Sequence, residues 1–285
     1  MIREDARLSR DLFDGFDLEE YLVSHGIHSL VGVELSEYGD PTRKKVKAPN
    51  ESVDPYLEEP FFAELDDLTR LHWLVTSRNV VTVLEFGVGK STVIFDHALR
   101  VNRALHGDFV SSNLRKGNPY ECHSIDNSAA WILNAQELHE FSRVTFHQCD
   151  LRMGEFNGRG CTFYDPLPNL SPDLIYLDGP DQFSVDGTVR GITTNHPDRM
   201  PMAADILVFE HFLTPGTLIV TDGRTANARF LRANLQRDWV YHHDASADQH
   251  YFELLEVPLG VYNKRHLDFA LGPAYFERLE ALQRD

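Results

Sequence analysis

Cysteine is scarce in this chain of 285 residues, and its spacing gives no sign of a metal or disulfide role. The three cysteines, Cys122, Cys149 and Cys161, show no CxxC pattern, so neither a zinc site nor a disulfide framework is expected. Cys122 and Cys149 lie in apolar runs typical of strands, which predicts small buried side chains.

Positive charge and long apolar runs are also lacking. Lys and Arg number 27 against 44 Asp and Glu, a formal net charge of −17. That balance disfavours nucleic acid and an anionic membrane as partners, because both bind through Lys and Arg. We interpret the basic residues 43–47 as a solvated loop. No run is long enough to span a bilayer and no signal peptide is visible, so a soluble cytoplasmic protein is expected.

The most informative segment is residues 80–92, Val-Val-Thr-Val-Leu-Glu-Phe-Gly-Val-Gly-Lys-Ser-Thr. Its first five residues are apolar or β-branched, as in a strand that is buried on both faces of a parallel sheet. A Gly-x-Gly turn and an apolar helical pattern follow. Such a turn lets a ligand approach backbone N–H groups without a Cβ in the way. The segment therefore predicts a nucleotide-type site.

Several motifs compete for this segment. A P-loop needs a glycine five residues before Gly89, where the chain has Leu84, and a dinucleotide fingerprint needs glycine in place of Thr92. The sequence Glu85 to Gly89 instead fits the [ED]-x-G-x-G loop of class I S-adenosylmethionine (SAM)-dependent methyltransferases. A glycine-rich turn without a ligand fits the segment equally well when it is taken alone.

From residue 80 onward strands alternate with helices, which predicts a doubly wound α/β fold. The expected strands are residues 80–84, 121–125, 144–148, 174–177 and 217–220. The expected helices are residues 91–105, 129–141, 203–212 and 225–236, with a polar excursion at 107–119. Residues 239–243 and 250–256 predict an antiparallel hairpin that completes a mostly parallel seven-stranded sheet.

The two ends of the chain are expected to be appendages to a SAM-binding domain of residues 61–260. Residues 1–60 form an accessory segment, with a helix in 10–24 and a proline-containing loop at 36–56. A helix in residues 61–79 packs on the sheet. Residues 261–285 form a C-terminal helix, whose apolar stripe is typical of a core but could also form a homo-oligomer contact.

Four strands end near an acid: Asp126, Asp150, Asp178 and Asp222. One such aspartate usually caps a helix or a turn, but ligands bind beyond the carboxyl ends of parallel strands. Four acids beside a glycine loop therefore predict a binding edge. Asp126 is the candidate for the ribose hydroxyls. Its distance from the loop exceeds the usual ~20 residues, and the excursion at 107–119 accounts for the surplus.

In this order the elements resemble the class I SAM-dependent methyltransferases over residues 60–256. Residues 85–89 match their motif I, 124–126 their ribose acid, 149–151 their adenine-side acid and 174–179 their motif IV. The resemblance implies SAM as cofactor. It also implies a set of cofactor-binding residues: Glu85, Gly87, Gly89, Ser91, Asp126, Asn127, Asp150 and Leu151.

A hydroxyl acceptor also needs a base or a metal. Asp178, Asp181 and Asp222 could hold Mg²⁺ or another divalent cation, as in the catechol O-methyltransferases. The chain departs from that family by Gly223-Arg224 in place of an amide and by Pro180-Asp181 in place of a catalytic lysine. The alternative base is His196, in the polar loop 193–198, where a surface histidine is an equally good interpretation.

We expect methyl transfer to a hydroxyl of a small molecule or glycan precursor, with Asp178, His196 and Asp222 as candidate catalytic residues. Two other classes stay open. One is a non-catalytic SAM- or nucleotide-binding protein. The other is a nucleotide-phosphate enzyme that uses Lys90, although Lys90 is expected to point outward from its helix.

Overall fold

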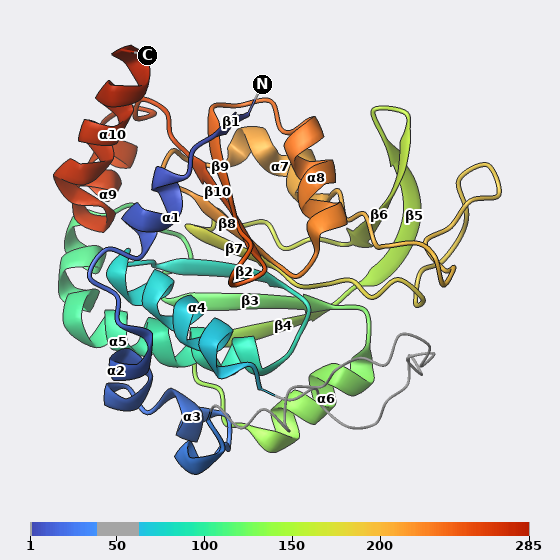
Figure 1. Cartoon of the computed structure of the whole chain (residues 1–285), viewed down its shortest axis with the longest axis horizontal. Coiled ribbons are helices and arrows are strands. Elements are labelled where there is room, and N and C mark those ends of the chain that lie inside the picture. Colours follow the sequence, from blue (N-terminus) through green and yellow to red (C-terminus); the bar gives the residue numbers. More distant parts are fainter. Residues whose placement is uncertain (1, 39–62, 285) are drawn as a thin grey trace.

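The computed structural model describes residues 2–38 and 63–284. Its centre is an eight-stranded, mostly parallel sheet in the order β1-β9-β10-β8-β7-β2-β3-β4 (Figure 1). The strands are β1 Arg3–Glu4, β2 Thr82–Phe86, β3 Glu121–Asp126, β4 Val144–Gln148, β7 Leu174–Leu177, β8 Leu218–Asp222, β9 Trp239–Asp244 and β10 Gln249–Leu254. The predicted α/β sheet with its antiparallel hairpin is confirmed, because only β10 runs against its neighbours.

The eighth strand, β1, was not predicted. It is two residues long, too short to give a period-two pattern, and it pairs in parallel with β9 through Arg3 and Val240. The helices are α1 Arg7–Leu12, α2 Leu18–Ser24, α3 Ile27–Leu30, α4 Leu65–Ser77, α5 Lys90–Asn113, α6 Ala129–Leu138, α7 Asp205–Phe209, α8 Thr225–Asn234, α9 Val261–Ala270 and α10 Gly272–Arg284. Within the described parts of the chain, no helix has the length and apolar character needed to cross a membrane.

Two helical predictions were wrong. Most of the excursion expected at 107–119 belongs to α5, which continues to Asn113 because Val110 packs in a small core with Val81 and Tyr120. The C-terminal helix is two helices, separated where Gly272 takes a positive φ of 61°. Residues 43–47 and most of the loop expected at 36–56 lie outside the described residues.

A second, two-stranded sheet was not predicted. Strands β5 Asp150–Phe156 and β6 Arg159–Asp165 form an antiparallel ribbon that projects beside the main sheet (Figure 1). Its turn is Asn157-Gly158, with φ values of 50° and 71°, and Asn-Gly is the strongest short-range hairpin signal. Residues 181–203 run along both edges of this ribbon. The Met153 N–H donates to the Asp186 carbonyl at 2.8 Å and the Thr162 N–H to that of Met202 at 2.9 Å.

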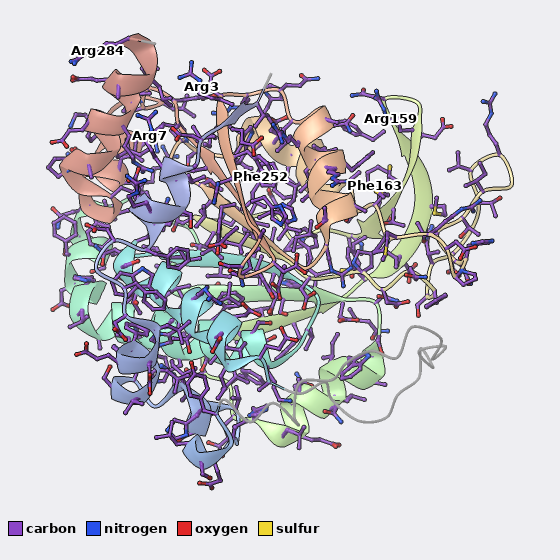
Figure 2. The ribbon with its side chains drawn as sticks, viewed as in Figure 1. Arg3, Arg7, Arg159, Phe163, Phe252 and Arg284 are labelled. Atoms are coloured by element: carbon purple, nitrogen blue, oxygen red, sulfur yellow. The ribbon has the colours of Figure 1, made fainter. Side chains whose placement is uncertain are left out.

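Two apolar layers cover the faces of the sheet. One joins the strands to α1, α2, α4, α5 and the C-terminal helices, and it includes Leu22, Leu71 and Tyr275. The other joins the opposite face to α7, α8 and the ribbon. Figure 2 shows Phe252 of this second layer inside the molecule, while Arg159 and Arg284 lie at the periphery. The carboxyl edge of the sheet lies between these layers and carries the candidate site.

Candidate functional site

The glycine loop between β2 and α5 is closed on one side and open on the other. Gly87 has a φ of +103°, and a Cβ there would lie 2.9 Å from the Gly179 nitrogen. The loop therefore packs backbone against backbone on the turn after β7. Gly89 is extended, with a φ of −168°. Within residues 2–38 and 63–284, a Cβ on Gly89 would meet only the Ser91 Oγ, at 3.9 Å. Gly89 thus offers backbone to open space, where a ligand can approach it.

Glu85 is the buried anchor of this loop. Its carboxylate accepts hydrogen bonds from the hydroxyls of Ser91 and Ser124, both at 2.5 Å, and of Thr92 at 2.7 Å. Burial raises the pKa of Glu85 to about 7, although these hydroxyls lower it. The side chain joins β2, β3 and α5 and so positions the loop. Direct contact of Glu85 or Ser91 with a cofactor stays a prediction.

Asp126, at the end of β3, lies directly against the glycine loop. Its Oδ2 accepts from the Val88 N–H at 3.0 Å, and its Oδ1 accepts from the Ser128 N–H at 2.8 Å. Burial raises its pKa. The neighbouring Asn127 donates to the Ser184 carbonyl at 3.3 Å. The structure therefore brings together the loop and the predicted ribose acid, which are far apart in sequence.

Asp150 and Leu151 follow the sheet strand β4 after one residue, as predicted, and they also begin strand β5 of the ribbon. Asp150 is 64% exposed and pairs with Arg152 at 2.6 Å, while Leu151 is buried. The preceding Cys149 N–H donates to the Asp126 carbonyl at 3.0 Å, which places this segment beside β3. An adenine contact by either residue stays a prediction.

Asp178 and Asp222 follow the adjacent parallel strands β7 and β8. Arg224 donates to the Asp178 Oδ1 at 3.2 Å and to the Pro180 carbonyl at 2.6 Å. The Tyr176 hydroxyl donates to the Asp222 Oδ2 at 3.1 Å. Burial, followed by the charge of Asp178, raises the pKa of Asp222 to about 7. Asp222 is therefore a carboxyl group that can exchange a proton near neutral pH.

Sequence analysis missed Asp67, which lies on α4 and faces this same edge. The Gln249 amide donates to its Oδ1 at 3.3 Å, and Gln249 is the register partner of Asp222. Burial, followed by the charge of Asp222, raises the pKa of Asp67 to about 8, despite its ion pair with Arg70 at 3.0 Å. No motif marks this aspartate, since its partner Gln249 lies 182 residues further along the chain.

The acids proposed for a divalent cation do not converge. Among residues 2–38 and 63–284, Asp178, Asp181 and Asp222 form no group of three ligand atoms close enough to share an ion. Asp181 Oδ1 instead accepts from the N–H groups of Phe183 at 2.6 Å and Ser184 at 2.9 Å. These residues as placed do not fit a Mg²⁺ site, so we derive no reaction step through such an ion.

His196 and Lys90 lie in contrasting positions. His196 is 47% exposed, on the segment that borders the ribbon, and its backbone carbonyl accepts from Gln182 at 3.1 Å. Lys90 was expected to point outward, but it is only partly exposed, and burial lowers its pKa. Neither position excludes a functional role, and both remain open to test.

Comparison with known proteins gives distant structural similarity only. No protein-family model matches the chain, and no curated protein matches it. Among solved structures, the chain is similar to the SAH-bound methyltransferase PaMTH1 of Podospora anserina. The TM-score is 0.40 and the identity 12%, over 88% of this chain and 94% of that one. A similarity this distant does not assign the chain to a family.

Proposed function

We propose that this protein is a SAM-dependent methyltransferase that acts on a hydroxyl of a small molecule or glycan precursor. The observation that carries the proposal is the glycine loop itself. Its Gly89 faces open space, and its Val88 N–H is fixed by the buried carboxylate of Asp126. The Gly89 N–H is itself held by the Thr92 hydroxyl at 3.1 Å, so the loop is already ordered. A ligand in that space would pack against this ordered backbone, beside an acid suited to ribose hydroxyls.

The charge of this edge favours SAM over a nucleotide triphosphate. Glu85 and Asp126 are hydrogen-bonded to the loop and to the start of α5, and Asp178 and Asp222 lie at the ends of the neighbouring strands β7 and β8, so this edge is lined by acids. Such surroundings repel phosphate groups, whereas they attract a positive sulfonium. The loop also lacks the length of a P-loop, as Leu84 lies within β2.

In this proposal SAM supplies the methyl group, and the chain positions the two reactants and receives the proton of the acceptor. Methyl transfer is an in-line displacement, so positioning can account for much of the rate. Asp222 is our candidate base, because a carboxylate with a pKa of about 7 can accept a proton at neutral pH. Tyr176 would keep that carboxylate oriented through its hydroxyl.

Calorimetric titration with SAM and with S-adenosylhomocysteine tests the proposal. We expect both to bind, while ATP does not. The absence of heat with either ligand at millimolar concentration would contradict it. Binding of SAM without transfer of a labelled methyl group to any member of a broad hydroxyl panel would favour the non-catalytic alternative.

The base is tested by comparing Asp222→Asn with His196→Ala. We expect Asp222→Asn to lower methyl transfer by about 10²–10⁴-fold with little change in SAM affinity. His196→Ala is expected to keep nearly full activity. If His196→Ala instead loses activity while Asp222→Asn keeps it, His196 is the base.

Because the acids do not fit Mg²⁺, adding Mg²⁺ to chelator-treated protein should leave the rate unchanged. A rise in rate would revive metal assistance.

A further inference from the structure

The tip of the β9–β10 hairpin gathers two histidines and an aspartate. His243 and His250 are direct cross-strand partners, and Asp248 lies in the connecting turn with a φ of +51°. Each of the three offers one ligand atom, and these atoms lie within 4.8 Å of one another. The His243 Nε2 is 3.9 Å from the Asp248 Oδ1. Of the described residues, no other histidine, cysteine or acidic side chains form such a group.

The Nε2 of His243 is a buried nitrogen without a hydrogen-bond partner among the described residues. An unsatisfied polar atom of this kind costs about 1–3 kcal/mol, and native structures contain few of them. A bound ion is one of the partners that would satisfy it. The nitrogen faces the Asp248 carboxylate without reaching it, which leaves room for an ion between them.

His250 is held as a metal-binding histidine needs to be. Its Nδ1 is 2.9 Å from the Tyr241 hydroxyl, and its Nε2 is 3.1 Å from the Thr225 hydroxyl. Whichever nitrogen binds the ion, the hydroxyl on the other nitrogen orients the ring.

The hairpin tip is also tied to the carboxyl edge of the sheet. The Gly223 N–H donates to the Asp248 carbonyl at 2.8 Å. A Cβ on Gly223 would lie only 3.6 Å from the Asp248 Oδ2. Gly223 directly follows Asp222, so an ion at this tip would fix the turn that carries the candidate base.

Binding requires two local changes, because one His250 nitrogen must exchange its hydroxyl partner for the ion and the histidine rings must also move. The His243 and His250 rings are stacked, with centroids 3.9 Å apart and an angle of 12° between their planes. A metal binds in the plane of each ring, so the rings must tilt, and the ligand atoms must approach to roughly 3.4 Å for zinc bonds of about 2.0–2.1 Å. His243 is one-third exposed, and χ2 of histidine has a broad minimum, so its ring can turn.

We propose that His243, Asp248 and His250 bind a zinc ion at the tip of the β9–β10 hairpin. Two imidazoles and one carboxylate suit Zn²⁺, whereas Mg²⁺ prefers oxygen ligands alone. With three protein ligands, the fourth position of the tetrahedron is left to water. This site is independent of the methyltransferase proposal, because it uses none of the residues assigned to SAM or to the base.

Zn²⁺ titration of chelator-treated protein, in competition with a chromophoric chelator, tests the site. The variants are His243→Ala and Asp248→Asn, both at partly exposed positions, and Asn keeps the positive φ of the turn. His242→Ala is the matched control, because successive strand residues point to opposite faces. The chain has 14 histidines, so weak background binding of Zn²⁺ is expected. The site is therefore judged from the difference in Zn²⁺ affinity between the site variants and the control.

We expect wild type and His242→Ala to bind one Zn²⁺ with the same affinity. Each site variant should bind at least about tenfold more weakly. Zn²⁺ should also raise the Tm of wild type and His242→Ala but not that of the site variants. Equal Zn²⁺ affinity in all four proteins, or no binding by wild type at submillimolar Zn²⁺, would overturn the proposal.

Discussion

The main sheet has buried acids at both ends of its parallel strands, and their pKa values are shifted in opposite directions at the two ends. The parallel strands begin at the amino edge and finish at the carboxyl edge. At the amino edge Asp173 and Glu253 are paired with cations, and both have lowered pKa values. At the carboxyl edge Glu85 and Asp222 meet hydroxyl groups and other carboxylates, and both have raised pKa values. The same kind of side chain thus stabilises the fold through cation pairs at one edge and holds protons near neutral pH at the other.

At the amino edge, charged contacts stabilise the fold. Asp173 accepts from the N–H groups of Val81 and Thr82 at 3.0 Å, from Lys116 at 2.5 Å and from His266 at 3.1 Å. Burial alone would raise its pKa, but Lys116 and His266 hold it well below its usual value. These contacts join the amino ends of neighbouring strands to the loop after α5 and to α9.

At the carboxyl edge, the burial of acids destabilises the fold. In the part of the chain that the structure describes, its acids have no comparable set of cations, since Arg224 pairs with Asp178 and Arg70 with Asp67 while the charges of the acids repel one another. Strongly shifted acids at the end of a sheet are characteristic of functional sites. The contrast between the edges therefore favours the carboxyl edge as the candidate site, independently of any motif.

The largest expected effect comes from breaking a cation pair at the amino edge. Arg78 is buried, and its guanidinium contacts Glu253 at 2.9 Å. Arg78→Met leaves that buried carboxylate with Arg278 alone, so we expect the free energy of unfolding to fall by about 3–5 kcal/mol in urea denaturation. The control Arg284→Met removes an exposed pair with Glu280 and should cost less than about 1 kcal/mol. Similar losses in both variants would contradict the distinction.

The opposite pKa shifts predict opposite pH dependences. Glu85 has a folded-state pKa of about 7 against an ordinary 4.5, so wild type loses stability as the pH rises between these values. The free energy of unfolding of Glu85→Gln, measured relative to wild type, should therefore rise by up to about 3 kcal/mol as the pH is raised from 5 to 8. Urea denaturation at each pH measures this change.

Asp173→Asn provides the matched comparison, because the folded-state pKa of Asp173 lies below its ordinary 3.8. This carboxylate stabilises the fold above pH 3.8, and that contribution is lost as the pH falls through the folded-state value. The free energy of unfolding of Asp173→Asn should therefore lie furthest below that of wild type at neutral pH, and this difference should shrink as the pH falls. If both variants change in the same direction with pH, the proposed contrast between the edges is wrong.

A smaller effect is expected in the glycine loop. Gly87→Ala combines a φ of +103° with a Cβ 2.9 Å from the Gly179 nitrogen. We expect a loss of roughly 2 kcal/mol in unfolding free energy, from strain and overpacking. Gly117→Ala is the control, since a Cβ there meets nothing within 4 Å. An unchanged Tm in Gly87→Ala would mean that the loop does not pack against the β7 turn as described.

The smallest effect is expected at Lys90. The loop before it is too short for a triphosphate, so Lys90→Ala should change SAM affinity by less than about twofold. Calorimetry with SAM and with ATP measures this directly. ATP binding by wild type that is lost in the variant would support the nucleotide-phosphate alternative instead.

Much of the central sheet could be predicted from the sequence, because each buried parallel strand is a short apolar run followed by a turn and a helix. The meeting of Gly87–Gly89 with Asp126 was also predictable, since both follow adjacent parallel strands. Asp67 was not, because its contacts depend on how α4 packs in three dimensions. The β5–β6 ribbon could have been predicted from Asn157-Gly158, whose hairpin signal was overlooked.

The central claim is that the open side of Gly89 receives the cofactor, and Gly89→Ala tests it most directly. Among the described residues the new methyl group would meet no atom closer than 3.9 Å, so the variant should fold with a Tm close to that of wild type and of Gly117→Ala. Calorimetric titration with S-adenosylhomocysteine should then show binding to wild type and Gly117→Ala, and binding weakened at least about tenfold in Gly89→Ala. Equal affinity in all three folded proteins would contradict the account.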